Sequence, residues 1–433
     1  SVPGSPFRHD TVRIRRPNDR YHTADTDGRT DADSWTVDGE DGQMTTSNWS
    51  APETEVLDAI VSGITDQQAV LATVVAVDGS AYRRPGAKMV IAGDGDGVGA
   101  VTAGCLEDQV LGLAEQVLAD SEPRIERFDL TGTDDVWGLG VGCNGVVDIL
   151  LEPLDAAYRP VAEAHETTDD IAVLTMLDGG ETNIEQGDHV FAHPTGAAER
   201  RNLSFEPPPT DWPDGLLAIL TEPTAELLAA DTSDSITVGW EGKTVEVFVD
   251  SIRAPPELVV FGSGHDVPPV VELAKQVGFS VTVVTFRGII KDDRQFPAAD
   301  RVFTTAPADL QEILTFDTDT YAVVMSHNFV DDRLAVDELL ATPVEYIGMV
   351  GSRGRFEEMQ EAFAAEGRRF SDAERDRIYT PAGLDLGGGT PFHIAQSIVA
   401  EITAVHHGRD PQHLTDRAGP IHERSPVTES VDD

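Results

Sequence analysis

The sequence holds little cysteine, little lysine and no long apolar run. Its two cysteines exclude a disulfide framework, and only four of its 31 basic residues are lysines. No stretch reaches the roughly 18 apolar residues of a membrane helix, and no charged and then apolar leader opens the chain. These absences predict a soluble protein of the cytoplasm.

Acidic residues are abundant instead. The 433 residues include 77 Asp and Glu, and the formal net charge is −46. Such a surface repels phosphate backbones and anionic lipid headgroups, so we expect no nucleic acid and no membrane as partner. Because the acids are scattered along the whole chain, we interpret them as adaptation to a salt-rich, halophilic cytoplasm rather than as a dock for a cationic partner.

Composition and periodicity divide the chain into five segments. Residues 1–50 and 408–433 are polar and predict disordered tails. Residues 51–155 predict a mixed α/β domain, and 156–255 repeat its order of elements without its cysteines, which suggests a degenerate second copy. In 256–407 short apolar strands alternate with helices, as in a Rossmann-like, doubly wound parallel sheet. The predicted fold class is therefore α/β.

Hydrophobic periodicity places the individual elements. Strands are expected at 70–77, 89–92, 124–130 and 146–151, then at 171–177, 190–192, 236–240 and 244–249, and finally at 258–261, 280–285, 321–325 and 346–350. The main helices are expected at 53–69, 105–118, 215–230, 267–277, 307–314, 332–341, 353–366 and 391–407. The segment SIRAPP at 251–256 is predicted to be a linker.

The clearest local motif is the glycine loop FGSGHDV at 261–267, with Gly262 and Gly264. It follows an expected strand and precedes an expected helix, where nucleotide-binding folds set backbone N–H groups against phosphate. The third glycine position of the fingerprint holds Val267, and Thr285 stands where an acidic residue would hold the ribose. The motif supports nucleotide binding in part, and a Rossmann-like domain without a ligand stays open.

Other polar residues follow strands of the same half. His265 belongs to the glycine loop, His327 to SHN at 326–328 and Arg353 to VGSRGR at 350–355. Because ligands bind at the carboxyl ends of such strands, all three are candidates for cofactor binding, and an arginine there suits a phosphate. The alternative for His327 is an ordinary loop histidine.

Both cysteines lie among glycines. Cys105 follows Gly104 at the expected start of a helix, and Cys143 lies in GLGVGCNG. A helix start favours a thiolate, whereas the acidic Glu107 opposes it. Two thiols brought together by folding would suit a soft centre such as molybdenum or a carried sulfur atom. The alternative is that both are small apolar residues of the core.

The loop GSAYRRPGAK at 79–88 concentrates basic residues in a chain that has few. It offers Arg83, Arg84 and Lys88 beside Tyr82. We interpret it as either an anion clamp or a solvated turn.

With these motifs, the chain resembles the XdhC/CoxI family of molybdenum-hydroxylase maturation proteins. The similar stretches are GSAYRRPGAKMVI, AGCLEDQV, WGLGVGCNGVVDILLEPL, LVVFGSGHDVPPVVELAKQVGFSVTVV, SHNFVDD, YIGMVGSRGR and PAGLDLGGGTPFHIAQSIVAEI. They cover roughly 56–407. The presence of a middle segment is similar to the CoxI-like branch.

The resemblance implies a chaperone of the molybdenum cofactor, a molybdopterin with or without an attached nucleotide, rather than a catalyst. Such a protein assists sulfuration and delivers the cofactor to an apo molybdenum hydroxylase of the xanthine or CO dehydrogenase type. A cysteine desulfurase or other sulfur donor and a homodimer are the further partners implied. Cys105 matches the cofactor-associated cysteine, a molybdenum ligand, and Cys143 matches the second cysteine motif.

Two other functions stay open at this point. An NAD(P)-dependent oxidoreductase could be built on the Rossmann half, although the sequence has no Tyr-x-x-x-Lys pair for hydride chemistry. A scaffold that only docks a partner enzyme is the third interpretation.

Overall fold

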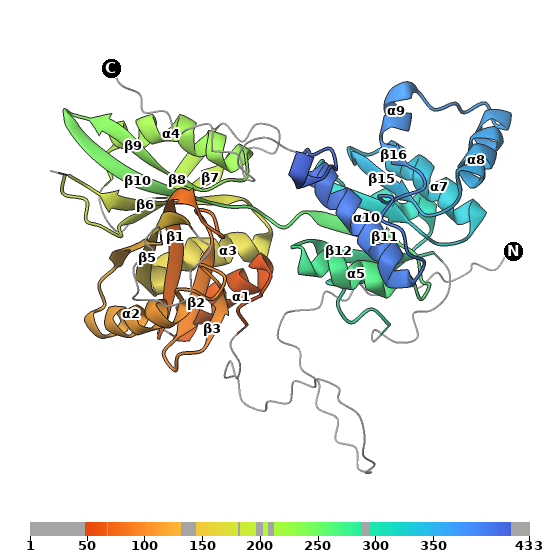
Figure 1. The fold of residues 1–433 in the computed structure, drawn as a ribbon. Helices are drawn as coiled ribbons and strands as arrows, with labels where there is room; N and C mark the ends of the chain where they lie inside the picture. Colours follow the sequence, from red (N-terminus) through yellow and green to blue (C-terminus); the bar gives the residue numbers. More distant parts are fainter. Residues whose placement is uncertain are drawn as a thin grey trace, which may run out of the picture. The chain divides into compact units, whose positions relative to one another are not determined.

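The structure, a computed structural model, describes residues 48–66, 68–130, 144–180, 182–195, 202–206, 212–286 and 295–416. Over these ranges the chain divides into two compact units, which meet in sequence between Ala254 and Pro255. They follow one another along the colour bar of Figure 1. Within the ranges described, no helix has the length and apolar character needed to cross a membrane. The predicted tails at 1–47 and 417–433 lie outside the described residues.

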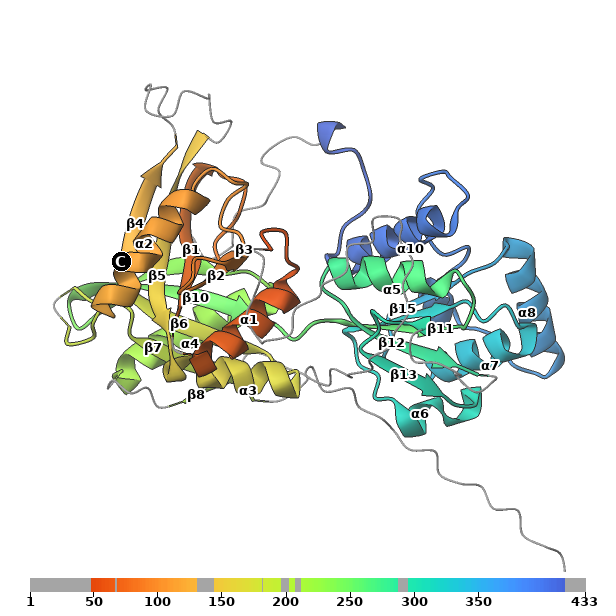
Figure 2. The ribbon, with the colours of Figure 1, turned by 90° about the horizontal axis from the view of Figure 1, so that it is seen from below.

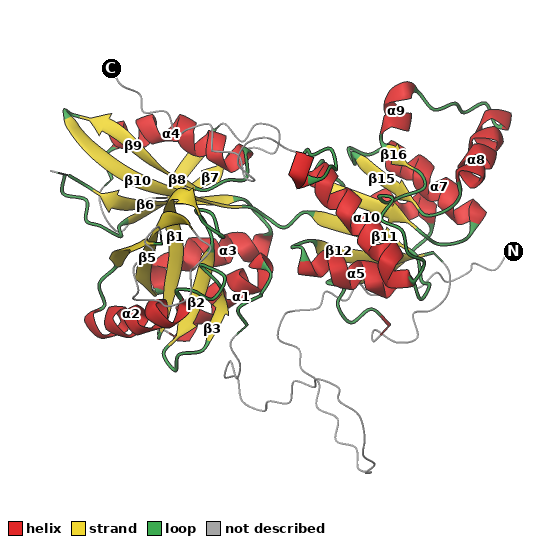
Figure 3. Cartoon of the chain, viewed as in Figure 1, coloured by secondary structure: helices red, strands yellow, loops and turns green. Residues whose placement is uncertain are grey.

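The first unit contains two five-stranded sheets of the same topology. The strand order of sheet A is β3-β2-β1-β5-β4, and that of sheet B is β8-β7-β6-β10-β9. In both sheets one helix precedes the central strand and another lies between the third and fourth strands (Figure 3). The second copy therefore repeats the first strand for strand, as the order of elements in the sequence predicts.

The elements of this unit have the following bounds. Sheet A consists of β1 Ala69–Ser80, β2 Lys88–Ala92, β3 Gly97–Gly99, β4 Arg124–Asp129 and β5 Asn144–Leu154, with helices α1 Glu53–Asp66 and α2 Glu107–Asp120. Sheet B consists of β6 Ile171–Asp178, β7 His189–Pro194, β8 Leu203–Glu206, β9 Asp234–Trp240 and β10 Lys243–Ile252, with helices α3 Arg159–Thr167 and α4 Asp214–Ala229. β10 continues to Ile252, so the predicted linker at 251–256 begins inside a strand.

Alternation along β1 explains how the two copies pack. Val70, Ala72 and Val74 belong to the core that α2 covers, whereas Leu71 belongs to the core shared with α1, α3 and sheet B. On the far side of sheet B, α4 packs its leucines against β6 and β10. Because successive side chains of a strand point to opposite faces, β1 is buried on both faces from Ala69 to Val75.

A buried ion pair links sheet A to sheet B. Lys88 Nζ lies 2.8 Å from Asp250 Oδ1, and the Ser233 hydroxyl donates to the same oxygen at 3.0 Å. Only 3% of the Lys88 side chain and 8% of the Asp250 side chain are exposed. Burial acts to lower the pKa of Lys88, but the attraction of Asp250 outweighs it and the pKa is raised. The end of the 79–88 loop is thus fixed to the second copy.

A second buried polar cluster joins the copies nearby. Glu152 of β5 accepts a hydrogen bond from the Tyr158 hydroxyl at 2.7 Å, and its other oxygen lies 2.8 Å from His189 Nε2 of β7. Burial raises the pKa of Tyr158 well above its usual value, and the carboxylate of Glu152 adds to the rise. The phenol therefore stays a hydrogen-bond donor across the accessible pH range.

We predict that the free energy of unfolding falls as the pH rises through the pKa of His189. Burial acts to lower this pKa, but Glu152 raises it above the unfolded value of 6.5. The ion pair therefore stabilises the protein fully below the unfolded pKa and loses that contribution as the imidazole deprotonates. Chemical denaturation from about pH 6 to about pH 9 measures the fall. His189→Gln cannot titrate, so an equal slope in this variant would contradict the prediction.

The second unit is a six-stranded parallel sheet. Its order is β13-β12-β11-β14-β15-β16, which is the Rossmann order 3-2-1-4-5-6 and confirms the predicted fold. The strands are β11 Glu257–Phe261, β12 Ser280–Thr285, β13 Arg301–Thr304, β14 Thr320–Val324, β15 Tyr346–Met349 and β16 Ile378–Tyr379. The helices are α5 Val267–Gln276, α6 Leu310–Ile313, α7 Phe329–Leu340, α8 Arg353–Ala365, α9 Asp372–Asp376 and α10 Pro391–His406.

Helices cover both faces of this sheet. Leu258 and Val260 of β11 pack with α5 and α10, whereas Val259 and Phe261 pack with α6, α7 and α8. Figure 2 shows α5 and α10 on one side of the strands and α6 on the other. The carboxyl edge of the sheet, where β11 and β14 diverge, is left to the loops that carry the polar motifs.

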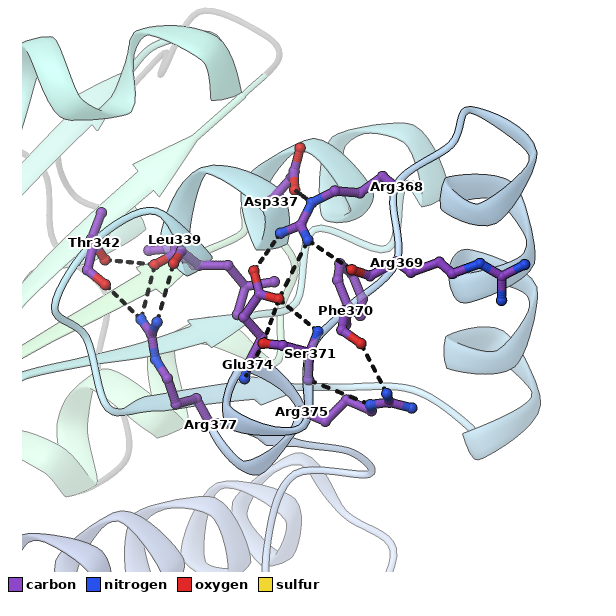
Figure 4. Close-up of polar contacts among 11 residues, drawn as sticks. Asp337, Leu339, Thr342, Arg368, Arg369, Phe370, Ser371, Glu374, Arg375 and Arg377 are labelled. Carbon is purple, nitrogen blue, oxygen red and sulfur yellow. Dashed lines mark hydrogen bonds and ion pairs between the residues drawn. The ribbon is translucent and has the colours of Figure 1, made fainter.

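Arginines hold the last edge strand in place (Figure 4). The Arg377 guanidinium donates to four backbone carbonyls at the end of α7 and in the following turn, those of Leu339, Leu340, Thr342 and Val344. Burial lowers the pKa of Arg377. Nearby, Arg368 pairs with both Glu374 and Asp337. These contacts explain why β16 joins the sheet with only two residues.

Candidate functional site

The glycine loop of the second unit lies at the point where the strand order reverses. The Gly262 N–H donates to the Val284 carbonyl at 2.9 Å. A Cβ at Gly262 would lie 2.8 Å from the Met325 carbonyl oxygen, so only glycine lets the loop approach the end of β14 this closely. Ligands of doubly wound sheets bind at this switch point, and the motif predicted from the sequence occupies it.

His327 reaches across the switch point to the glycine loop. Its Nε2 lies 2.8 Å from Asp266 Oδ2, and a Cβ at Gly264 would lie 3.7 Å from its Cδ2. The His327 backbone has a φ of 57°, a left-handed conformation that is costly for a residue other than glycine. Asp266 occupies the N-cap of α5 but bonds the histidine rather than a helix amide. The structure therefore brings Gly264 and His327 together.

The two arginines of VGSRGR have different positions. Arg353 is exposed at the first residue of α8, and its side chain makes no polar contact with the described part of the chain. Arg355 points inward, with Nη2 2.7 Å from Asp332 Oδ2. Asp332 is fully buried and also accepts a hydrogen bond from Ser326. Arg353 is thus free to meet a ligand, whereas Arg355 ties the β14 loop to α8.

The other two candidates of this edge contribute differently. His265 is exposed in the glycine loop. Thr285 is buried, and its hydroxyl lies 2.9 Å from the Thr304 hydroxyl. Its side chain thus faces the neighbouring strand and not the position of a ribose. Phe286 stacks on Phe261 with ring centroids 5.7 Å apart.

In the first unit, Cys105 lies in a surface turn. It is a free, half-buried cysteine and packs at the margin of the core beneath α2, as do Val77, Ala81 and Ala87. The helix begins at Glu107, so the expected helix start at Cys105 is two residues early. Gly104 has a φ of 100°, and no atom lies within 4 Å of the place where its Cβ would stand. The turn therefore combines an accessible backbone with a thiol that is anchored on one side.

Hydrogen bonds close this turn from beneath. The Thr102 hydroxyl donates to the Glu107 carboxylate, at 2.7 and 2.6 Å from its two oxygens. The same hydroxyl accepts from the amides of Cys105, at 3.2 Å, and Leu106, at 3.3 Å. Sequence reasoning treated Glu107 only as a charge opposing the thiolate and missed this role. A signal was present in the flanking of Gly104-Cys105 by Thr and Glu.

The loop at 79–88 presents fewer charges than predicted. Arg83 is exposed, and Arg84 is half-buried with an Nε atom that has no hydrogen-bond partner within the described ranges. Lys88 is buried against Asp250, so its assignment to an anion clamp is wrong. A Cβ at Gly86, whose φ is 93°, would lie 2.6 Å from Ser233 Oγ. The loop is thus seated on the second copy and offers two arginines.

Cys143 lies outside the described residues. The next residue, Asn144, pairs with Ser80 at the point where the 79–88 loop leaves β1. Strands β4 and β5 are connected by residues 130–143, whereas the equivalent strands of the second copy, β9 and β10, are joined by Glu241 and Gly242 alone. The long connection that carries the second cysteine therefore belongs to the first copy only.

Both units match models of one family. The family described as XdhC and CoxI matches residues 65–129, and the one described as XdhC Rossmann domain matches residues 258–402. The chain belongs to the XdhC and CoxI family. The first match contains the Cys105 turn, and the second contains the glycine loop, His327 and Arg353, so every described candidate lies in a family segment.

Relatives of this XdhC-type chain share most of its length. A protein of Bacillus subtilis (strain 168), named as a probable component of xanthine dehydrogenase, is 29% identical over 352 residues, which cover 80% of this chain and 95% of the relative. An uncharacterized protein of Escherichia coli (strain K12), YqeB, is 27% identical over 38% of this chain and 30% of its own length. A crystal structure of a xanthine dehydrogenase from Bacillus halodurans is 28% identical with a TM-score of 0.64, covering 83% of this chain and 97% of that one.

Proposed function

We propose that this XdhC-type chain matures a molybdenum enzyme by binding the molybdenum cofactor and delivering it to the apoenzyme. The observation that carries the proposal is the Cys105 turn. It offers a free thiol beside an open glycine, inside the segment that matches the XdhC and CoxI family. The names of the relatives from B. subtilis and B. halodurans support a client of the xanthine dehydrogenase type.

The donor set of the first unit fits such a cofactor. When bound, the cofactor supplies the molybdenum centre of the client. Within the described ranges there is no cluster of three or more His, Cys, Asp or Glu side chains that could hold a metal ion. A single soft thiol, Cys105, instead suits a metal that arrives with ligands of its own. The unpartnered Nε of Arg84 and the exposed Arg83 would contact the anionic part of the molecule.

The second unit suits the nucleotide that some forms of the cofactor carry. Gly262 and Gly264 would let phosphate approach the backbone at the switch point, and His265, His327 and Arg353 would surround it. The buried Thr285 offers no carboxylate to a ribose, so an NAD(P)-dependent oxidoreductase is the weaker alternative. We assign these residues to binding and not to catalysis.

Further partners follow from the same proposal. Sulfuration needs a sulfur donor such as a cysteine desulfurase, and Cys143 joins Cys105 as a second thiol for that exchange. We also propose a homodimer in the cytoplasm of a halophile, where salt screens the net charge of −46.

Metal analysis of the gently purified full-length chain tests the function. Produced in a cell that makes the cofactor, the protein should carry molybdenum and a fluorescent pterin in equal amounts. Nicotinamide without molybdenum would favour the oxidoreductase. A protein that carries neither, and that gains neither when incubated with the released cofactor, would leave only a docking scaffold and overturn the proposal.

A further inference from the structure

We propose that Glu107 is a positioning residue that holds Cys105 ready for the cofactor. The inference rests on the proposed function for the role of Cys105, but its geometry does not. Glu107 stands in the first turn of α2 with only 8% of its surface exposed. Its neighbour Asp108 is exposed, as acids at a helix start usually are.

The carboxylate of Glu107 closes the turn as a clasp with Thr102. Besides the Thr102 hydroxyl, it accepts from the Thr102 amide at 3.1 Å and from the Leu106 amide at 3.1 Å. The clasp therefore joins the two ends of the turn and leaves Ala103 and Gly104 at the surface above it. A carboxylate is needed there, because every contact to it comes from a donor.

The link from the clasp to Cys105 is a single atom. The Thr102 hydroxyl has one hydrogen and two lone pairs, and all are used: it donates to Glu107 and accepts from the amides of Cys105 and Leu106. Glu107 thus orients the hydroxyl that fixes the backbone of Cys105. A ligand on the surface of the turn would meet the thiol and not Glu107, which acts through Thr102.

Positioning of this kind lowers the cost of ordering the turn when the cofactor binds. Without the clasp, the turn would open more often, and the thiol would leave the core margin where it is half-buried. The proposal therefore predicts two linked changes: faster reaction of Cys105 with small reagents, and weaker retention of molybdenum.

The experiment compares Glu107→Gln and Thr102→Val with two matched controls, Asp108→Asn and Thr102→Ser. Alkylation of Cys105 by iodoacetamide is followed by peptide mass mapping, which separates it from Cys143, and molybdenum is counted on the same samples. We expect both clasp variants to alkylate about fivefold faster than the natural chain. They should also retain less molybdenum, while both controls behave like the natural chain.

The outcomes separate this inference from the proposed function. If the natural chain holds no molybdenum, the proposed function fails, and the alkylation rates still test the clasp. If the natural chain holds molybdenum and Thr102→Val matches Thr102→Ser in both readouts, the inference is overturned. Should Glu107→Gln fail to fold, the threonine pair decides alone, because valine and serine differ from threonine only in the methyl and hydroxyl groups.

Discussion

Cys105→Ser should lose most of the bound molybdenum and keep its fold. Serine is nearly the size of cysteine, but its hydroxyl is a hard ligand and carries no transferable sulfur. Cys105 lies in a turn at the margin of the core, so the exchange disturbs little packing. We expect molybdenum per protein to fall at least about tenfold, since even outer-sphere changes at metal sites cost about 10–100-fold.

Mass spectrometry of the metal and a melting curve on the same sample check this result. If Cys105 were only a core residue, the hydroxyl would lower the free energy of unfolding by about 1–3 kcal/mol and leave the cofactor in place. Ala103→Ser, in the same surface turn, is the matched control and should retain its molybdenum. Full occupancy in Cys105→Ser would remove this thiol from the site.

Asp250→Ala should lower the free energy of unfolding by about 3–5 kcal/mol, because it leaves the buried ammonium of Lys88 without its partner. The loss is measured by denaturant unfolding in salt. The exposed pair of Arg127 and Asp148 gives the matched control, since 73% of the Arg127 side chain is exposed. Arg127→Ala should cost about 0–1 kcal/mol.

The double variant Lys88→Met with Asp250→Leu refines the same test. Replacing both charges removes the unpaired ammonium, so it should be more stable than Asp250→Ala alone. If Asp250→Ala were as mild as Arg127→Ala, the pair would not be the link between the two copies. Because Lys88 ends the 79–88 loop, the single variant should also loosen Arg83 and Arg84.

Much of the Rossmann half was predictable, and its gaps have a physical cause. Strands β11, β12, β14 and β15 are apolar runs buried on both faces, and each was predicted within one residue of its bounds. The edge strands β13 and β16 were missed, because RVFT and IY carry too few apolar residues to show a period. β16 exists through Arg377, which binds carbonyls 33 to 38 residues away.

The same limit decided the site. Gly104 and Cys105 stand out locally, and the structure gives them an open surface turn. Lys88 was misread, because its partner Asp250 is 162 residues away and no local pattern joins them. The pairing of His327 with Asp266, 61 residues apart, likewise becomes visible only when β11 and β14 lie side by side.

The central place of β1 in sheet A also governs how the chain is made. β1 pairs with β5, from Ala69 opposite Leu154 to Ser80 opposite Asn144, so its edge waits for a strand some seventy residues downstream. At about 5–20 residues per second, a ribosome needs several seconds to supply it. During that time an apolar strand stands unpaired, a template for aggregation. β6 repeats the wait for β10, so a nascent chain passes through this exposure twice before the Rossmann half begins.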